Sequence, residues 1–564
     1  MQRRSKSKPQ SKKKTMKGPA DDATPSAADK THATRLLIVS VKNEAPFLLE
    51  WVAYHRALGF NRLVVFSSES DDGSTDLLNA LAANDIIEHV EHAPAPGVER
   101  LADAARLANE SAILNGADWA MWLDVDEFLV ISKGNGTLDA LIDALADRDG
   151  MLVPRRMMGD GGNDRFPGHL VSEDFTDAAA ADDGSNLEAK TLFRCSDKIE
   201  GFFLHGTHRP KIRAGMDASD LSFVMASGNA LDLRHRAHRR WISGEDFSRT
   251  RQVQPDEHGY ALAQINCYAV RTPEHFVLKH NLAHGAEAGQ TAQSLDQNAS
   301  GLYRAQNYAA TQDRRILRLA DATRDQLTYL RSLPGVTEAE AEARTRLDAR
   351  LADIPAHVLD ACRATRPARV EPRHFPLTLP DEEAALLRAE YAKADTILEY
   401  GSGGSSFVAL EGDAKTLFTV ESDRAWALAI YDSLQAAHPH ADFTVQYVDI
   451  GRTKAWGKPA GCEGYAQYAR YPASVWDLIQ FKQPDIVLVD GRFRAACFLT
   501  TLFRTRKPVT LLFDDYTGRP YYHWIEKYAQ PSHIAGRMAR FDLEPMAIPP
   551  QDLTQILSAY ADPQ

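Results

Sequence analysis

Short apolar runs alternate with amphipathic stretches from residue 35 onward, and this alternation predicts an α/β fold. Residues 35–41 and 63–66 are apolar, β-branched runs typical of buried parallel strands. Between them, residues 47–58 carry apolar side chains at helical spacing, and Gly59 is expected to close that helix. A third apolar run, 117–123, completes the order strand, helix, strand, helix, strand, which predicts a sheet of parallel strands.

Each of these three runs is followed directly by acidic residues. Ligands of such sheets bind outside the carboxyl ends of the strands, and Glu44, Asp72 and the pair Asp124 and Asp126 all fall there. Each has a structural explanation on its own, as an acid in the first turn of a helix, a turn residue or a helix cap. Their joint occurrence at three strand ends nevertheless indicates a ligand site.

Asp124 and Asp126 are separated by one residue, so both carboxylates can reach one cation where the strand opens into a loop. Hard divalent cations are commonly held by one or two carboxylates and by phosphate oxygens of a nucleotide. A cation in that position assists departure of a diphosphate as a Lewis acid. The pair therefore predicts a metal-binding, catalytic position for a nucleotide diphosphate.

The chain reads KNEAPFLLEWVAYHRALGF, SDDGSTD and WLDVDEF in that order, followed by KTLFR, HRPK and INCYAVRTPEHFVLKHNLAHG. Over roughly residues 35–310 these segments resemble the GT-A glycosyltransferases of family 2, in particular the family-92-like branch. The resemblance implies a nucleotide-sugar donor, nucleoside contacts from Glu44 and Asp72, and manganese or magnesium on Asp124 and Asp126. Contacts to phosphate or an acceptor are predicted for Lys190, Arg209, Lys211, Tyr268 and Lys279. For the basic residues among them, surface salt bridging is the alternative.

Two positions depart from that family pattern. Cys267 stands where the pattern has a histidine before Tyr268, and Ala283-His284-Gly285 stands where it has Arg-Gly. Either Cys267 or His284 substitutes at an altered donor site, or Cys267 is a small buried apolar residue. The catalytic base of an inverting reaction would be a carboxylate near the acceptor hydroxyl. The candidates are Asp160, Asp164, Glu173 and Asp174.

A change in amino-acid composition marks the end of the first α/β pattern. Residues 309–368 are rich in Ala, Arg, Glu and Leu at helical spacing and predict a helical connector, which ends in a proline-rich stretch. A second α/β pattern follows. The expected domains are a basic tail at 1–34, a glycosyltransferase domain at 35–308, the connector at 309–368 and a second nucleotide-binding domain at 369–564.

The second pattern places a glycine-rich turn after its first strand. Glu399, Gly401, Gly403 and Gly404 form it, and Glu421 follows the next strand at the ~20-residue distance at which an acid can accept hydrogen bonds from a ribose. These residues resemble class I S-adenosylmethionine-dependent methyltransferases, which implies S-adenosylmethionine as cofactor, with Asp449 near the adenine. Asp490 is the predicted base, and Arg492, Asp514, Asp515 and Tyr516 are expected to line the acceptor side.

Other interpretations of this turn fit less well or stay open. A dinucleotide oxidoreductase would have G-x-G-x-x-G, and a phosphate-binding loop would have Gly-Lys-Ser/Thr, which is absent. A domain that binds the cofactor without turnover, or binds nothing, stays open. The polar residues at the later strand ends could equally serve as caps and turns.

Composition limits the partners and the compartment. The 564 residues carry a formal net charge of -12, which argues against nucleic acid as the main partner. Five scattered cysteines without a CxxC pair indicate neither a zinc site nor a disulfide framework, and favour a reducing, cytoplasmic setting. The basic tail is followed by neither a signal sequence nor a membrane span. It is interpreted as a disordered tail, with weak contact to anionic membrane surfaces as the alternative.

The sequence therefore predicts a glycosyltransferase that moves a sugar from a nucleotide-diphosphate donor to an unknown glycan or small-molecule acceptor. The second domain is predicted to methylate a glycan or related small molecule, and its fusion to the first domain suggests consecutive steps on one product. The alternative is a binding or scaffold protein in which one of the two domains is catalytically inactive.

Overall fold

The structure is a computed structural model. It describes residues 33–165, 168–204, 206–217, 220–231, 238, 253, 257–280, 292–371, 373–412 and 415–564. The basic tail and Ala283-His284-Gly285 lie outside these residues, so the predictions made for them are not addressed by the structure. No helix in the described ranges is long and apolar enough to cross a bilayer.

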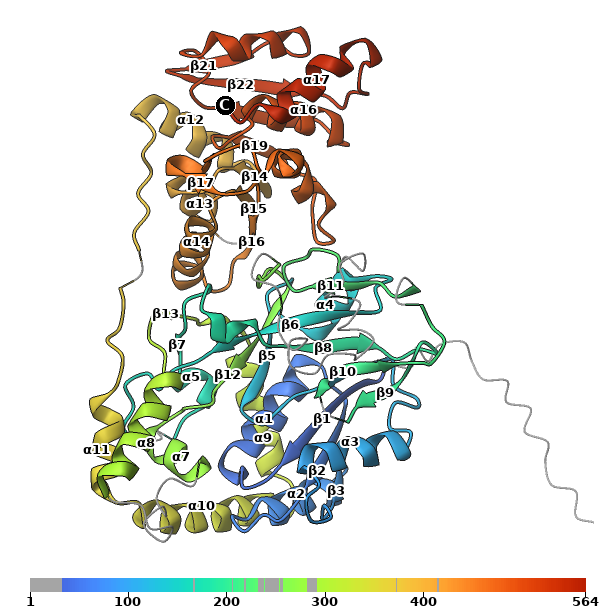
Figure 1. The fold of residues 1–564 in the computed structure, drawn as a ribbon, viewed down its shortest axis with the longest axis vertical. Helices are drawn as coiled ribbons and strands as arrows, with labels where there is room; N and C mark the ends of the chain where they lie inside the picture. Colours follow the sequence, from blue (N-terminus) through green and yellow to red (C-terminus); the bar gives the residue numbers. More distant parts are fainter. Residues whose placement is uncertain are drawn as a thin grey trace, which may run out of the picture. The chain divides into compact units, whose positions relative to one another are not determined.

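The N-terminal half is built on a mixed sheet with the strand order β3-β2-β1-β4-β8-β6-β12-β5 (Figure 1). Strands β3, β2, β1 and β4 are parallel, whereas β8 is antiparallel to both β4 and β6. The strands are β1 (Arg35–Val41), β2 (Arg62–Ser67), β3 (Glu88–Glu91), β4 (Trp119–Trp122), β5 (Glu127–Ile131), β6 (Gly150–Met157), β8 (Ala189–Arg194), β12 (Ala263–Cys267) and β11 (Phe223–Met225), which pairs with β6.

Helices follow the parallel strands and cover the sheet. They are α1 (Ala45–Leu58), α2 (Ser74–Ala83), α3 (Arg100–Glu110) and α4 (Leu138–Leu145), with the later α5 (Val171–Asp174), α7 (Pro273–Lys279) and α8 (Ala292–Gln306). Along β1, Leu37 and Val39 join one hydrophobic core and Leu36 and Ile38 join another. This period of two shows that β1 is buried on both faces, as its continuous apolar run predicted.

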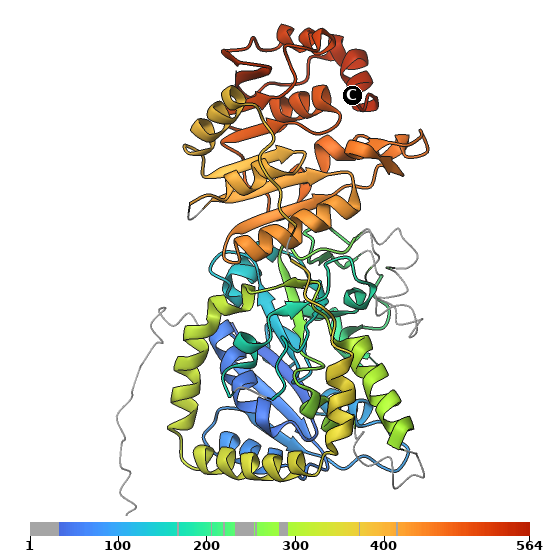
Figure 2. The ribbon, with the colours of Figure 1, turned by 90° about the vertical axis from the view of Figure 1, so that its left-hand side faces the viewer.

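The segment predicted as a connector is helical, and its helices pack on helices of the N-terminal half. Its helices are α9 (Ala320–Arg331), α10 (Val336–Ala352) and α11 (Ala356–Ala364). Helix α9 lies beside α1, α10 contacts α2, and α11 packs on α8 (Figures 1 and 2). A short strand, β13 (Thr311–Gln312), precedes them and pairs with β7 (Asp177–Ala178). The segment 309–368 therefore contributes to the N-terminal half.

The C-terminal part is a second sheet with the order β16-β15-β14-β19-β20-β22-β21. Its neighbours are parallel from β16 to β20, and β22 is antiparallel to both β20 and β21. The strands are β14 (Thr396–Tyr400), β15 (Thr416–Glu421), β16 (Asp442–Tyr447), β19 (Ile486–Val489), β20 (Val509–Phe513), β21 (His533–Ala535) and β22 (Met538–Leu543). The chain leaves the central strand β14 in both directions, so a topological switch point lies between β14 and β19.

Helices on both faces complete this part. They are α12 (Asp381–Tyr391), α13 (Gly404–Ala409), α14 (Arg424–Ala437), α15 (Arg470–Ala473), α16 (Arg494–Arg504) and α17 (Leu553–Ala561). Ile397 packs in one core and Leu398 in the other. The sequence thus anticipated the mixed α/β character of both halves, with strand ends displaced by one or two residues. It did not anticipate the antiparallel strands β8 and β22.

Candidate active sites

Glu44 and Asp72 lie next to one another at the carboxyl ends of β1 and β2, as predicted. The Asp72 carboxylate accepts hydrogen bonds from the backbone amides of Ala45, at 2.9 Å, and Ser74, at 2.9 Å. It therefore fixes the start of both α1 and α2. Glu44 forms an ion pair with Arg271, at 3.4 Å between Oε2 and Nη1. Burial raises the pKa of Glu44 above its ordinary value, although Arg271 opposes the shift. Their predicted nucleoside contacts stay predictions.

Asp124 and Asp126 occupy the turn between β4 and β5, where each carboxylate meets a lysine. Lys190 Nζ donates to Asp124 Oδ2 at 2.8 Å, and Lys279 pairs with Asp126. Two predicted phosphate contacts are thus brought directly to the two predicted metal ligands. Burial alone would raise the pKa of Asp126, but Lys279 and Arg271 hold it below its ordinary range. Asp126 is consequently ionised at neutral pH.

Three further residues complete this cluster, and the sequence analysis did not single them out. Glu127, which is fully buried, accepts from Arg155 Nε at 2.8 Å and pairs with Lys190 at 2.5 Å. Arg271 packs its guanidinium 3.4 Å from the centre of the Phe47 ring. Glu127 directly follows Asp126 in WLDVDEF, and Arg271 lies within INCYAVRTPEHF, so the quoted segments contained both. The proximity of Glu127 and Arg271 becomes visible only in the structure, where β12 pairs with β5 and Cys267 lies opposite Glu127.

Replacing Lys190 with methionine is expected to destabilise the fold by about 3 kcal/mol, because the buried carboxyl group of Glu127 would lose one of its two cationic partners. Lys190 is 5% exposed, whereas the side chain of Lys279 is 33% exposed. Lys279→Met is therefore the matched control and should lower the unfolding midpoint much less. Equal midpoints for the two variants in denaturant titrations would contradict this assignment of the buried charge.

The structure resolves the surroundings of Cys267 and Tyr268. Cys267 on β12 is buried and lies opposite Glu127 on β5. Burial, together with the nearby charge of Asp126, raises the pKa of the Cys267 thiol to about 12. It is a neutral, buried thiol beside the acidic turn. The Tyr268 ring is 1% exposed and packs against Phe128, while its backbone amide donates to the Asp126 carbonyl at 2.7 Å. Tyr268 thus reaches the site through its backbone, and its buried ring is not placed for the predicted substrate contact.

Arg209 and Lys211 lie elsewhere, on the hairpin of β9 (Ile199–Phe203) and β10 (Gly206–Ile212). Lys211 pairs with Glu200 at 2.7 Å. The guanidinium of Arg209 lies 4.8 Å from the centre of the Phe203 ring. These contacts match the salt-bridging and packing alternative for both residues rather than a place in the acidic cluster.

The four candidate bases have different partners. Asp160 accepts from Arg366 Nε at 2.5 Å and from the Tyr303 hydroxyl, and Asp164 pairs with Arg366 at 2.6 Å. Glu173 pairs with Arg324. Asp174 contacts His169 at 3.3 Å through Oδ1, and its buried Oδ2 has no hydrogen-bond partner within the described ranges. Burial raises the pKa of Asp174, which makes its carboxylate a stronger base than an ordinary aspartate.

The short helix α5, which ends at Asp174, is anchored to α1. Glu50 Oε2 accepts from the Val171 amide at 2.7 Å, and Oε1 accepts from the Ser172 amide at 3.0 Å. These bonds fix the start of the short helix that ends at Asp174. Glu50 stands on the same helix whose first turn carries Glu44, and Arg271 acts electrostatically on both Glu50 and Asp126.

In the C-terminal part, the glycine-rich turn lies at the switch point after β14. Gly401 has φ +98°, and a Cβ there would lie 2.9 Å from the Gly491 Cα, so the turn passes against the loop after β19. Gly404 meets the carbonyl oxygen of Pro376, which a Cβ would approach to 2.3 Å. Gly403 precedes α13, and its amide donates to the Ser406 hydroxyl at 3.3 Å. Glu399 is buried and accepts from Tyr391 at 2.8 Å, which is an internal role.

Glu421 and Asp449 follow neighbouring strands, β15 and β16. Glu421 Oε1 accepts from the amides of Ser422 at 2.7 Å and Asp423 at 3.1 Å, and Oε2 accepts from the Ser402 hydroxyl at 3.3 Å. Burial raises the pKa of Glu421. Asp449 Oδ1 accepts from the Gly451 amide at 2.8 Å. Both residues therefore lie at or just beyond the carboxyl ends of their strands, and Glu421 contacts the glycine-rich turn through Ser402.

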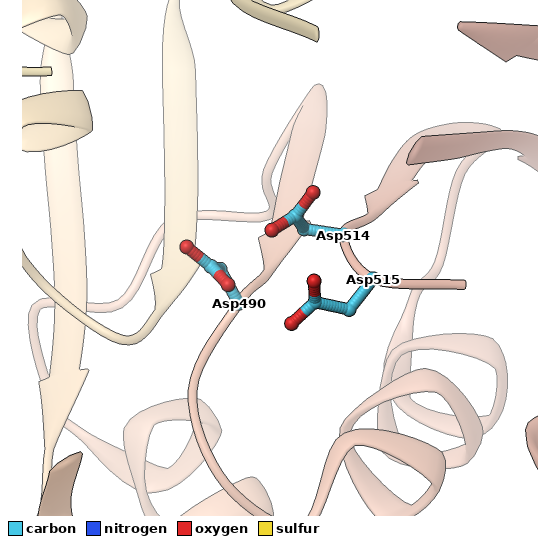
Figure 3. A group of neighbouring side chains, drawn as sticks. All are labelled: Asp490, Asp514 and Asp515. Carbon is cyan, nitrogen blue, oxygen red and sulfur yellow. The ribbon is translucent and has the colours of Figure 1, made fainter. Parts of the chain in front are cut away.

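Asp490, Asp514 and Asp515 converge after β19 and β20 (Figure 3). One oxygen from each lies within 4.8 Å of the others. Arg494 pairs with Asp490 at 3.0 Å and with Asp515 at 3.3 Å, and Arg537 pairs with Asp514 at 2.8 Å. Burial and the neighbouring aspartates raise the pKa of Asp490 to about 7, against the effect of Arg494.

The other two predicted lining residues, Arg492 and Tyr516, are buried, as Asp514 is. Tyr516 is 2% exposed and donates its hydroxyl hydrogen to Glu526 at 2.9 Å, and Arg492 is buried. The three aspartates are thus held together by Arg494 and Arg537, which neutralise them.

Comparison with known proteins gives a family match in the N-terminal half. Residues 39–153 match the family model described as Glycosyltransferase family 92. A glycosyltransferase family 92 protein of Oryza sativa subsp. japonica is 24% identical over 206 residues, which are 36% of this chain and 32% of the rice protein. The chain thus spans about a third of the length of the curated relative it matches.

Among solved structures, S. aureus TarS aligns at 15% identity over 59% of this chain and 90% of its own, with a TM-score of 0.21. A methyltransferase-like protein from Silicibacter pomeroyi aligns at 44% identity over 34% of this chain and 99% of its own, with a TM-score of 0.33. The comparisons thus give a family 92 match over residues 39–153 and, over about a third of the chain, a likeness to a methyltransferase-like protein.

Proposed function

We propose that the N-terminal half transfers a sugar from a nucleotide-diphosphate donor to a hydroxyl acceptor. The observation that carries this proposal is the meeting of Asp124 and Asp126 with Lys190, Lys279 and Arg271 at the carboxyl edge of the sheet. Cations next to ionised carboxylates suit a ligand that brings both phosphate oxygens and a divalent metal. The family 92 match at residues 39–153 supports the same activity.

The side chains present fit a hard divalent cation such as manganese or magnesium. Asp126 is ionised, and the Asp124 side chain is 41% exposed, so both carboxylates can offer oxygen atoms. Such a cation would neutralise the charge that develops on the departing diphosphate. Lys190 and Lys279, which pair with the two carboxylates, would then contact phosphate oxygens. Cys267 contributes no charge to this donor set, because its thiol stays protonated.

Asp174 is proposed as the base that accepts the proton of the acceptor hydroxyl. It has a buried oxygen without a partner in the described part of the chain, whereas the other three candidates are paired with arginines. A base with a raised pKa binds a proton more strongly and matches a hydroxyl donor better at neutral pH.

For residues 369–564 we propose binding of S-adenosylmethionine and methyl transfer to an oxygen acceptor. The switch point between β14 and β19 is where open α/β sheets bind nucleotides, and the glycine-rich turn and Glu421 both lie there. The matched share of 34% corresponds to about 192 residues, close to the size of this part, and the matched protein is described as methyltransferase-like. Asp490, with a pKa of about 7, is the proposed base.

A thermal-shift panel on the purified chain tests both proposals. We expect UDP or GDP to stabilise the protein only with manganese, and S-adenosylhomocysteine to stabilise it independently. A ligand at 100 times its dissociation constant stabilises its site by about 2.7 kcal/mol, which is readily measured. ATP with manganese serves as the control for unspecific nucleotide binding.

Each arm has its own negative outcome. If no nucleotide shifts the unfolding midpoint in the presence of manganese, the donor site fails. If S-adenosylhomocysteine has no effect, the methyltransferase proposal fails. Binding without turnover in either half would favour a binding or scaffold protein. For the first domain this alternative is motivated by Cys267, which stands where the family pattern has a histidine.

A further inference from the structure

The segment after β16 carries an aromatic side chain that is unusually exposed. Trp456 is 85% exposed, although large aromatic residues normally bury most of their surface. It also adopts a left-handed backbone conformation, with φ 67° and ψ 27°, which costs about 1 kcal/mol or more in a residue other than glycine. Exposure and backbone strain together at one bulky residue need an explanation beyond folding.

A short hairpin holds Trp456 in this position. Strand β17 (Thr453–Lys454) pairs with β18 (Lys458–Pro459), and Trp456 lies in the connection between them. Gly457 anchors the hairpin, because its carbonyl accepts from the Ser422 hydroxyl at 2.9 Å. A Cβ on Gly457 would lie 2.5 Å from Ser422 Oγ and 3.2 Å from Glu421 Oε1. The hairpin tip is therefore pressed against the carboxyl end of β15.

The place of this contact identifies the kind of ligand. In open α/β sheets the acid that ends the second strand accepts hydrogen bonds from the ribose of a bound nucleotide. The nucleotide base extends from that ribose toward the neighbouring strand, here β16. The hairpin follows β16 after the loop 448–452 and folds back onto Ser422, and within that loop the Val448 amide donates to the Glu421 carbonyl at 2.8 Å. Trp456 is thus one residue from the contact with the ribose-binding acid.

We propose that Trp456 stacks on the adenine of the nucleoside bound at Glu421 and so acts as a cofactor-binding residue contributed by the hairpin. The proposal rests on the proposed nucleotide site of the C-terminal part. Its exposure leaves the indole accessible, and the contact of Gly457 with Ser422 keeps the backbone of the hairpin next to Glu421. A stacked purine would cover the surface that is now in water.

Titration calorimetry of the full chain with S-adenosylhomocysteine tests the proposal. Trp456→Ala is expected to raise the dissociation constant about 5- to 150-fold, the range of an aromatic side chain that stacks on a base. Trp456→Phe should restore most of the affinity. Tyr465→Ala removes another exposed aromatic of the same segment, at 72% exposure, and is the matched control that should leave affinity unchanged.

Trp456→Gly separates stacking from a structural role. Glycine adopts a positive φ without strain, so a merely structural residue would give an equal or higher unfolding midpoint and unchanged affinity. Stacking predicts an unchanged or higher midpoint together with weaker binding. Adenosine titrations should show the same loss as S-adenosylhomocysteine.

The outcomes distinguish this proposal from the one beneath it. If the wild-type chain does not bind S-adenosylhomocysteine, the nucleotide site itself fails. If the wild-type chain binds and Trp456→Ala binds equally well, the site stands and the role of Trp456 is overturned.

Discussion

Asp126→Asn is expected to lower the rate of sugar transfer by on the order of 10³-fold, because an ionised ligand at the departing diphosphate contributes several kcal/mol to the transition state. Asparagine keeps the size of the side chain but not its charge. The partner lysine, Lys279, is one-third exposed and stays solvated when its carboxylate is lost. The fold should therefore tolerate the change, and the loss should appear in turnover.

The measurement is release of nucleoside diphosphate from the donor identified by thermal shift, at a series of manganese concentrations. The variant should need far more manganese and should not regain the wild-type rate at saturation. Asp147→Asn, at an exposed acid on the surface of the same half, is the control and should behave as wild type. A variant at Asp126 with the wild-type rate and manganese dependence would remove this turn from the chemistry.

The positions of the acids at the strand ends were readable from the sequence, and the positions of their partners were not. Continuous apolar runs specify buried parallel strands, so Glu44, Asp72 and Asp124 had to lie at one edge of the sheet. Arg155 and Arg271 reach the same cluster from β6 and from the segment after β12. Their proximity depends on the antiparallel pairing of β12 with β5, and hydrophobic pattern does not specify which strands pair.

Side-chain direction limited the sequence analysis in a second way. Neighbouring residues on a strand point to opposite faces, and residues just beyond a strand end follow no fixed rule. Tyr268 was predicted as a contact from its motif, yet its ring packs in the core and only its amide touches Asp126. Trp456 drew no attention as a single aromatic in a polar segment, because its exposure and backbone conformation are visible only in three dimensions.

The second large effect is expected at Asp174. If it accepts the proton of the acceptor hydroxyl, Asp174→Asn should reduce sugar transfer about 10²- to 10⁴-fold, the usual contribution of a positioned base. Donor binding should be unchanged, because Asp174 is not among the groups that contact Asp124, Asp126 or their lysines. A thermal shift with nucleotide and manganese, equal to that of wild type, would establish this separation.

The pH dependence gives the sharper test. A base acts only when deprotonated, and burial raises the pKa of Asp174 above its ordinary value. The wild-type rate should therefore fall on the acid side at a higher pH than an ordinary aspartate would allow, and the asparagine variant should lack that limb. Asp164→Asn is the matched control, since the Asp164 side chain is 59% exposed and pairs with Arg366. Loss of the acid limb in the Asp164 variant, with the limb retained in the Asp174 variant, would assign the base to Asp164. The arginine pairing would then have to open during the reaction, at the cost of separating two charges that the resting structure holds 2.6 Å apart.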